Sequence, residues 1–241
     1  MTIIGLLLWL TSFGQGEALS CIDKALASSF QAMVSAEPQL RYDSAAPAFV
    51  KLLKEQLVDP VTFYNSLDSL SKYLNVITSG DKQVKFYSWD EIGGGTWHKI
   101  NCFAQFKTDN EKIVVQQINT EDEEGIDFTD SGIYEVNEIF INGTKYYLTF
   151  ASGTHGSGHQ HKIVQLFSIS SEVLVKCKSC FAGYNDLIIE YPRGDKVTLV
   201  FNEKTNEIYY SEFKLDVNMG FYEPTGKVIT LKLIKGKFIP R

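Results

Sequence analysis

The first third of the chain places its apolar residues at helical spacing. The segment from Ile22 to Ser35 is rich in Ala, Leu, Phe and Met, and a proline follows it closely. A second segment runs from Phe49 to Val58, and Asp59 with Pro60 then forms an N-terminal cap for a third helix. The apolar stripes of the last two segments are Phe49, Leu52, Leu53 and Leu57, then Phe63, Leu67, Leu70 and Leu74. Such stripes usually belong to a core, so the pattern predicts a helical segment over residues 15–79 without chemistry of its own.

At Ser79-Gly80-Asp81 the period changes from helical to alternating, and it stays alternating to the C-terminus. Turn residues separate the alternating runs, and Asn142-Gly143 is the strongest hairpin signal among them. The predicted strands are 83–89, 98–107, 112–119, 133–141, 145–152, 161–169, 173–177, 186–191, 197–202, 207–214 and 227–234.

Short strands with hairpin-length links predict an antiparallel β-meander over residues 80–241. The fold class is therefore α+β and mostly β, with a short N-terminal helical segment packed on the sheet. The pattern leaves a barrel, a sandwich and a propeller-like arrangement open. We expect the helical segment to cover an open face or edge, which protects strands from pairing with other chains.

The N-terminus carries an uninterrupted apolar run from Ile3 to Leu10, followed by small and polar residues. This run is too short to span a bilayer, and it is typical of a signal peptide, here residues 1–14 with cleavage after Gly14. The alternatives are a buried N-terminal element and a lipoprotein anchored through Cys21, whose preceding residues only partly match a lipobox. We expect an exported protein, periplasmic or secreted.

The composition narrows the choice of partners. The chain has 29 Asp and Glu against 23 Lys and Arg and no basic stripe, so nucleic acid is not an expected partner. No second apolar stretch approaches membrane-spanning length, so the mature chain is expected to be soluble and without a transmembrane segment.

The four cysteines, Cys21, Cys102, Cys177 and Cys180, form an even set in a chain predicted to reach an oxidising compartment. They are disulfide candidates, and three pairings are formally open. Cys177 and Cys180 also have the C-x-x-C spacing of redox sites, but a strand and turn surround them where thiolate chemistry needs a helix N-terminus. A structural disulfide or a pair of thiols in a tight turn is the favoured interpretation, with zinc binding as an alternative.

Three short motifs resemble uncharacterised secreted proteins of Bacteroidota type. They are KFYSWD at residues 85–90, GGTWH at 94–98 and FAQF at 103–106. The resemblance runs from the third predicted helix to the C-terminus. It implies export, and it offers no established activity and no catalytic residue.

The most distinctive stretch is THGSGHQH at residues 154–161, which holds three of the four histidines. His159 and His161 share one face if the strand already begins at His159, and His155 could join them across a glycine-rich link. Three imidazoles with an open coordination position could hold zinc or copper and activate water. The alternative is a polar hairpin tip whose histidines have no common ligand. His98 follows a Gly-rich turn and is expected at the same end of the sheet.

Other candidates are less specific. Ser157 lacks the spacing of a nucleophile elbow, so we predict no catalytic residue. The acidic run at residues 121–130 could bind calcium but lacks the EF-hand pattern, which favours a solvated turn. Trp97 and His98 are candidate ligand-binding residues, and Trp89 with Trp97 could form a glycan platform.

These features together predict a non-enzymatic binding or cell-envelope-associated module, with no required cofactor. The competing hypothesis is a metal-dependent hydrolase or metal-binding protein that uses His155, His159 and His161 with zinc.

Export can be tested at the mature N-terminus. Cleavage after Gly14 predicts that protein recovered from the periplasm or the medium begins at Gln15, which intact-mass and N-terminal sequencing measure. Met1 on the recovered protein would overturn the signal-peptide prediction. A lipid on Cys21 would replace it with the lipoprotein alternative.

Overall fold

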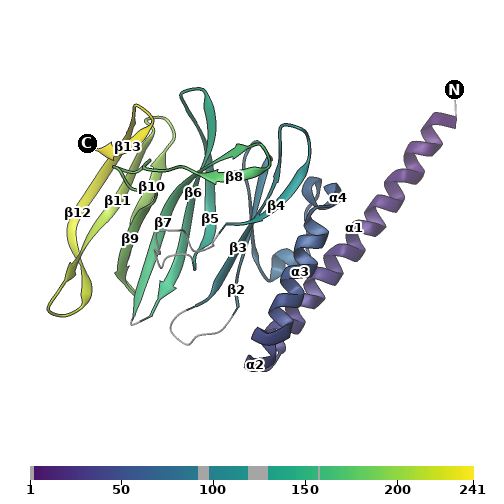
Figure 1. The fold of residues 1–241 in the computed structure, drawn as a ribbon, viewed down its shortest axis with the longest axis horizontal. Helices are drawn as coiled ribbons and strands as arrows, with labels where there is room; N and C mark the ends of the chain where they lie inside the picture. Colours follow the sequence, from purple (N-terminus) through teal and green to yellow (C-terminus); the bar gives the residue numbers. More distant parts are fainter. Residues whose placement is uncertain (1–2, 92–97, 119–129, 157) are drawn as a thin grey trace.

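The computed structural model describes residues 3–91, 98–118, 130–156 and 158–241. Side chains are described over the same ranges except for residues 3–15 and His155. Helices occupy the N-terminal third, and antiparallel sheets follow (Figure 1).

The helical third consists of one long helix and several short ones. They are α1 (Ile3–Ser35), α2 (Pro38–Leu40), the π-helical turn η1 (Arg41–Ala45), α3 (Ala46–Leu57), α4 (Pro60–Tyr64) and the 3-10 turn η2 (Leu70–Lys72). The side chain of Asp59 accepts a hydrogen bond from the backbone N–H of Val61 and caps α4, as the sequence predicted.

The described strands form three separate sheets. Sheet A contains β1 (Asn75–Thr78), β2 (Val84–Asp90), β3 (Ile100–Lys107) and β4 (Ile113–Gln117) in that order. Sheet B contains β5 (Gly132–Ile141), β6 (Thr144–His155), β7 (His159–Ser170) and β8 (Val173–Lys176), with β9 (Leu187–Pro192) also paired to β7. Sheet C contains β10 (Leu199–Asn202), β11 (Glu207–Asp216), β12 (Phe221–Ile234) and β13 (Lys237–Pro240).

The helices and the three sheets stack as four layers, with a hydrophobic core between each neighbouring pair (Figure 1). Leu26, Phe49 and Leu53 of the helices pack against Tyr87 and Phe103 of sheet A. A second core joins sheet A to one face of sheet B, and a third joins the other face of sheet B to sheet C. None of the described sheets closes on itself, so the barrel alternative is wrong.

Alternation along the strands decides which side chain enters which core. In β2, Phe86 enters the core shared with sheet B, whereas Tyr87 faces the helices. In β6, Tyr147 faces sheet A and Leu148 faces sheet C, and both are essentially inaccessible to solvent. Sheet B is thus covered on both faces. Side chains that alternate along its strands, as the predicted period of two requires, enter two different cores.

The structure differs from the sequence prediction in the third helix and at both ends of the β region. The third predicted helix is only α4, and its remaining apolar residues lie on turns and η2. Residues 75–78 form β1 instead of extending the helical segment, and β13 was not predicted. Strand β12 begins at Phe221 and runs through Pro224, which the sequence marks as a turn. Pro224 is tolerated because it pairs with Phe213 beside a β-bulge, where the ladder is already interrupted.

Helix α1 joins the folded body only along its C-terminal part. Among the described side chains of α1, packing begins at Leu19, and the N-terminal turns of the helix extend past α3 and α4 in Figure 1. The guanidinium of Arg41 donates to the carbonyls of Met33, Val34 and Ala36, and so satisfies the open C-terminal end of α1. Among the described residues, no helix is both long enough and apolar enough to cross a membrane.

Asp23 ties α1 to the segment that leads into sheet A. Its carboxylate is buried and accepts hydrogen bonds from the backbone N–H groups of Ser69 at 2.8 Å and Leu70 at 2.9 Å. These two donors begin the η2 turn, so one side chain positions the chain between α4 and β1.

We predict that Asp23→Ala lowers the free energy of unfolding by about 2 kcal/mol, because two backbone donors lose their acceptor. The exposed neighbour Asp68 provides a matched control, and Asp68→Ala should change stability by less than about 0.5 kcal/mol. Urea denaturation with unchanged slope measures both variants. Equal stability of the two variants would contradict this role for Asp23.

Candidate functional site

The histidine-rich stretch lies in hairpin β6–β7. Strand β6 continues to His155 and β7 already begins at His159, so these two residues pair across the hairpin. Gly153 pairs with His161 further along the same hairpin. The condition set by the sequence, that His159 lies in a strand, is met.

His161 of β7 is buried. Its Nε2 lies 2.6 Å from the hydroxyl oxygen of Ser131, which is also buried. The facing residue Gly153 makes room for this pair, since a Cβ there would lie 2.6 Å from His161 Nε2 and 2.1 Å from the carbonyl oxygen of Asp130. Glycine at residue 153 therefore permits the close approach of three chain segments.

His159 contacts a different part of the molecule. Its ring packs edge-on against Phe221 and Tyr222 of β12, with centroid separations of 5.4 Å and 5.6 Å. The Tyr222 hydroxyl donates to the carboxylate of Glu190. Burial and this hydrogen bond together raise the pKa of Tyr222 to about 12. His159 is thereby fixed to sheet C, while His161 is fixed to Ser131.

The zinc hypothesis for His155, His159 and His161 remains a prediction. The contacts of His159 and His161 lead to different partners, and no group of three metal-ligating side chains occurs among the described residues. The side chain of His155 lies outside the described residues, as does Ser157.

His98 stands beside hairpin β6–β7. Its backbone N–H donates to the hydroxyl of Thr154 at 3.2 Å, and its Nδ1 contacts the carboxylate of Asp90. The contact with Asp90 orients the imidazole of His98. Trp97, its companion as a candidate ligand-binding residue, lies outside the described residues.

Two other candidates from the sequence are the glycan platform with Trp89 and the acidic run. Trp89 is buried in the core beneath the helices and stacks on Phe103 at 5.6 Å, so it does not present a face to a glycan. Most of the acidic run, residues 121–129, lies outside the described residues.

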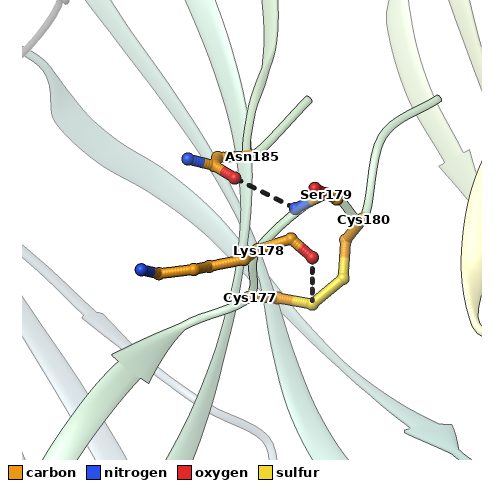
Figure 2. The surroundings of a disulfide bond; sticks show 5 residues. All are labelled: Cys177, Lys178, Ser179, Cys180 and Asn185. Atoms are coloured by element: carbon orange, nitrogen blue, oxygen red, sulfur yellow. Dashed lines mark hydrogen bonds between the residues drawn. A yellow bond between two sulfur atoms is a disulfide. The ribbon is translucent and has the colours of Figure 1, made fainter. Parts of the chain in front are cut away.

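Cys177 and Cys180 form a disulfide in the turn that follows β8 (Figure 2). The side chain of Asn185 accepts a hydrogen bond from the backbone N–H of Ser179 and closes this turn. No described helix begins here, which agrees with a structural disulfide. The backbone N–H of Phe238 in β13 donates a hydrogen bond to the backbone carbonyl of Cys180. The turn therefore also holds β13 against sheet B.

The other two cysteines lie in different layers of the fold. Cys21 is exposed on α1, and Cys102 is buried in β3. The hydroxyl of Ser88 donates to the sulfur of Cys102 at 3.1 Å. Burial raises the pKa of the Cys102 thiol to about 11, although this hydrogen bond opposes the shift. The buried sulfur is therefore a protonated core group at neutral pH.

Sequence reasoning missed a pocket of about 570 Å³ where the helical layer ends over sheet A. The chain from α4 to η2 forms one wall, and β1 and β2 form the floor. The lining residues are Phe63, Tyr64, Asn65, Ser66, Leu67, Ser71, Val76, Thr78, Asp81, Lys82, Gln83, Lys85, Tyr87 and Lys107. We call this the α4 pocket.

Gln105 holds the wall of the α4 pocket in place. Its amide donates to the carbonyl of Leu57 at 2.6 Å and to the hydroxyl of Thr62 at 3.0 Å. Its carbonyl accepts the hydroxyl of Tyr87 at 2.7 Å, and burial raises the pKa of that tyrosine. One buried side chain of β3 thus connects α3, α4 and the pocket floor.

A second hollow of about 410 Å³ adjoins the α4 pocket and shares Gln83 and Lys107 with it. Asp81 lies near the border, where its carboxylate accepts from Lys145 at 2.7 Å and from the hydroxyl of Tyr147 at 3.1 Å. Burial opposes ionisation of Asp81, but its hydrogen bonds with Lys145, Ser79 and Gln83 outweigh burial and lower the pKa. Asp81 is therefore ionised and paired with Lys145 at neutral pH.

The comparisons with known proteins give no relative. No family model matches the chain, and neither curated proteins nor solved structures contain a match.

Replacing Gly153 tests the close approach at His161. We predict that Gly153→Ala lowers the free energy of unfolding by about 3 kcal/mol, because its Cβ would overlap Asp130 and His161. The adjacent Ser152→Ala adds no atoms, so it should change stability by less than about 1 kcal/mol. Thermal melting and urea denaturation of both variants measure the difference. A Gly153→Ala variant as stable as the parent would refute this packing.

Proposed function

We propose that the protein is an exported, non-enzymatic binding module whose ligand lies in the α4 pocket. The observation that carries the proposal is the pocket itself, a concave site of about 570 Å³. Pockets of roughly 300–1,000 Å³ are the size that small-molecule ligands occupy.

The wall chemistry favours binding. Phe63, Leu67, Val76 and Tyr87 supply aromatic and aliphatic surface, and lysines with a few other polar groups supply the rest. Apolar walls with a few placed polar groups are typical of sites that orient a ligand. Gln105 fixes the wall to the floor before any ligand arrives, which reduces the ordering cost of binding.

Three features support export. The apolar run at residues 3–10 has the length of a signal-peptide core. The described packing of α1 begins at Leu19, on the C-terminal side of the proposed cleavage point. The disulfide between Cys177 and Cys180 is compatible with an oxidising compartment.

A neutral aromatic probe tests the pocket. N-phenyl-1-naphthylamine fluoresces in apolar surroundings, and we expect saturable enhancement with the intact protein. Thr78 lies on β1 directly opposite Lys85 and lines the pocket, so Thr78→Trp should weaken the probe about tenfold by filling the site.

The control is Val200→Trp, which adds the same side chain at an exposed strand residue in sheet C, away from the α4 pocket. This variant should bind the probe like the parent. Absence of saturable binding, or equal effects of the two tryptophans, would count against the α4 pocket as a ligand site.

A further inference from the structure

Lys85 occupies a fixed position in the α4 pocket. Its ammonium donates to the backbone carbonyls of Asn65 at 2.7 Å and Thr62 at 3.2 Å. It also lies 5.9 Å from the centre of the Phe63 ring. A lysine ammonium has three N–H donors, so two carbonyls hold the group and leave one donor for a further partner.

The ammonium of Lys85 forms no ion pair with any described carboxylate. Of the other two lysines in the lining, Lys107 contacts Glu111 at 2.9 Å, and Lys82 is exposed to solvent. Lys145, at the adjoining hollow, contacts Asp81 at 2.7 Å. Lys85 is half-buried, and burial lowers its pKa. A partly desolvated cation whose partners are neutral carbonyls is less stable than one that also meets an anion.

The apolar surface lies next to this cation. Val76 and Tyr87 face each other across β1 and β2 on the same side of sheet A as Lys85 and Thr78. Phe63 and Leu67 cover that surface from the helical layer. A ligand in this space meets aromatic and aliphatic walls along its body and the ammonium of Lys85 beside them.

We infer that the α4 pocket takes an organic anion, a carboxylate or sulfonate attached to a flat apolar body, and that Lys85 binds its anionic group. This assignment rests on the proposed binding function and specifies its ligand class. A cationic ligand fits poorly because lysines line the pocket. The carboxylate of the lining, Asp81, already forms an ion pair with Lys145.

Two probes with the same aromatic body test the assignment. N-phenyl-1-naphthylamine is neutral, and 8-anilinonaphthalene-1-sulfonate adds a sulfonate to that framework. We expect the intact protein to bind the sulfonate about tenfold more tightly, the effect of one charge-assisted hydrogen bond. Thr78→Trp should weaken both probes.

Variants of Lys85 separate the charge from the shape of the pocket. Lys85→Met and Lys85→Gln should remove the preference for the sulfonate and change binding of the neutral probe less than twofold. Lys85→Arg should keep the preference because it keeps the charge. Lys51→Met removes an exposed lysine of α3 that is not part of the pocket lining and should behave like the parent.

The outcomes distinguish the two proposals. Failure of the neutral probe to bind would remove the pocket function itself. Saturable binding of the neutral probe without a preference for the sulfonate would overturn only the anion assignment. A preference that persists in both Lys85→Met and Lys85→Gln would also overturn it.

Discussion

Burial of both faces of sheet B is the constraint on which the other layers depend. The run from Tyr147 to Ala151 is buried throughout, and its side chains alternate between two cores. A sheet with two apolar faces is stable in water only when something covers each of them. Sheet A and sheet C provide that cover, and the helices in turn cover the outer face of sheet A. The four-layer stack follows from this one requirement.

The α4 pocket arises where this cover ends. Helix α4 stops at Tyr64, and the chain first enters sheet A at β1. The helical layer therefore leaves the floor around Lys85 and Tyr87 incompletely filled. Gln105 fastens the remaining wall to the sheet, so the hollow is part of the packed structure. A pocket at the margin of a layer needs no departure from the packing rules that stabilise the rest.

The candidate chemistry shows how far local sequence reaches. THGSGHQH marked a hairpin, and the histidines do lie on β6 and β7. Their partners, however, come from distant elements: Ser131 for His161, and Phe221 with Tyr222 for His159. Lys85 gave no signal, because a lysine on an alternating strand is usually solvated. Its half-buried position depends on carbonyls of α4 and the following turn, about twenty residues earlier in the chain.

The sequence alone determined the N-terminal helices, most strands and the mainly antiparallel β class, because helix and strand periods and turn residues act over a few neighbours. It missed β1 and β13, which are only four residues each, and it began β12 only after the turn residues Pro224 and Gly226. Tertiary structure alone decided the division into three sheets, their order in the stack and the meeting of Lys85 with α4. Those features depend on which apolar faces pack together, and contacts between residues far apart in the chain leave no local pattern.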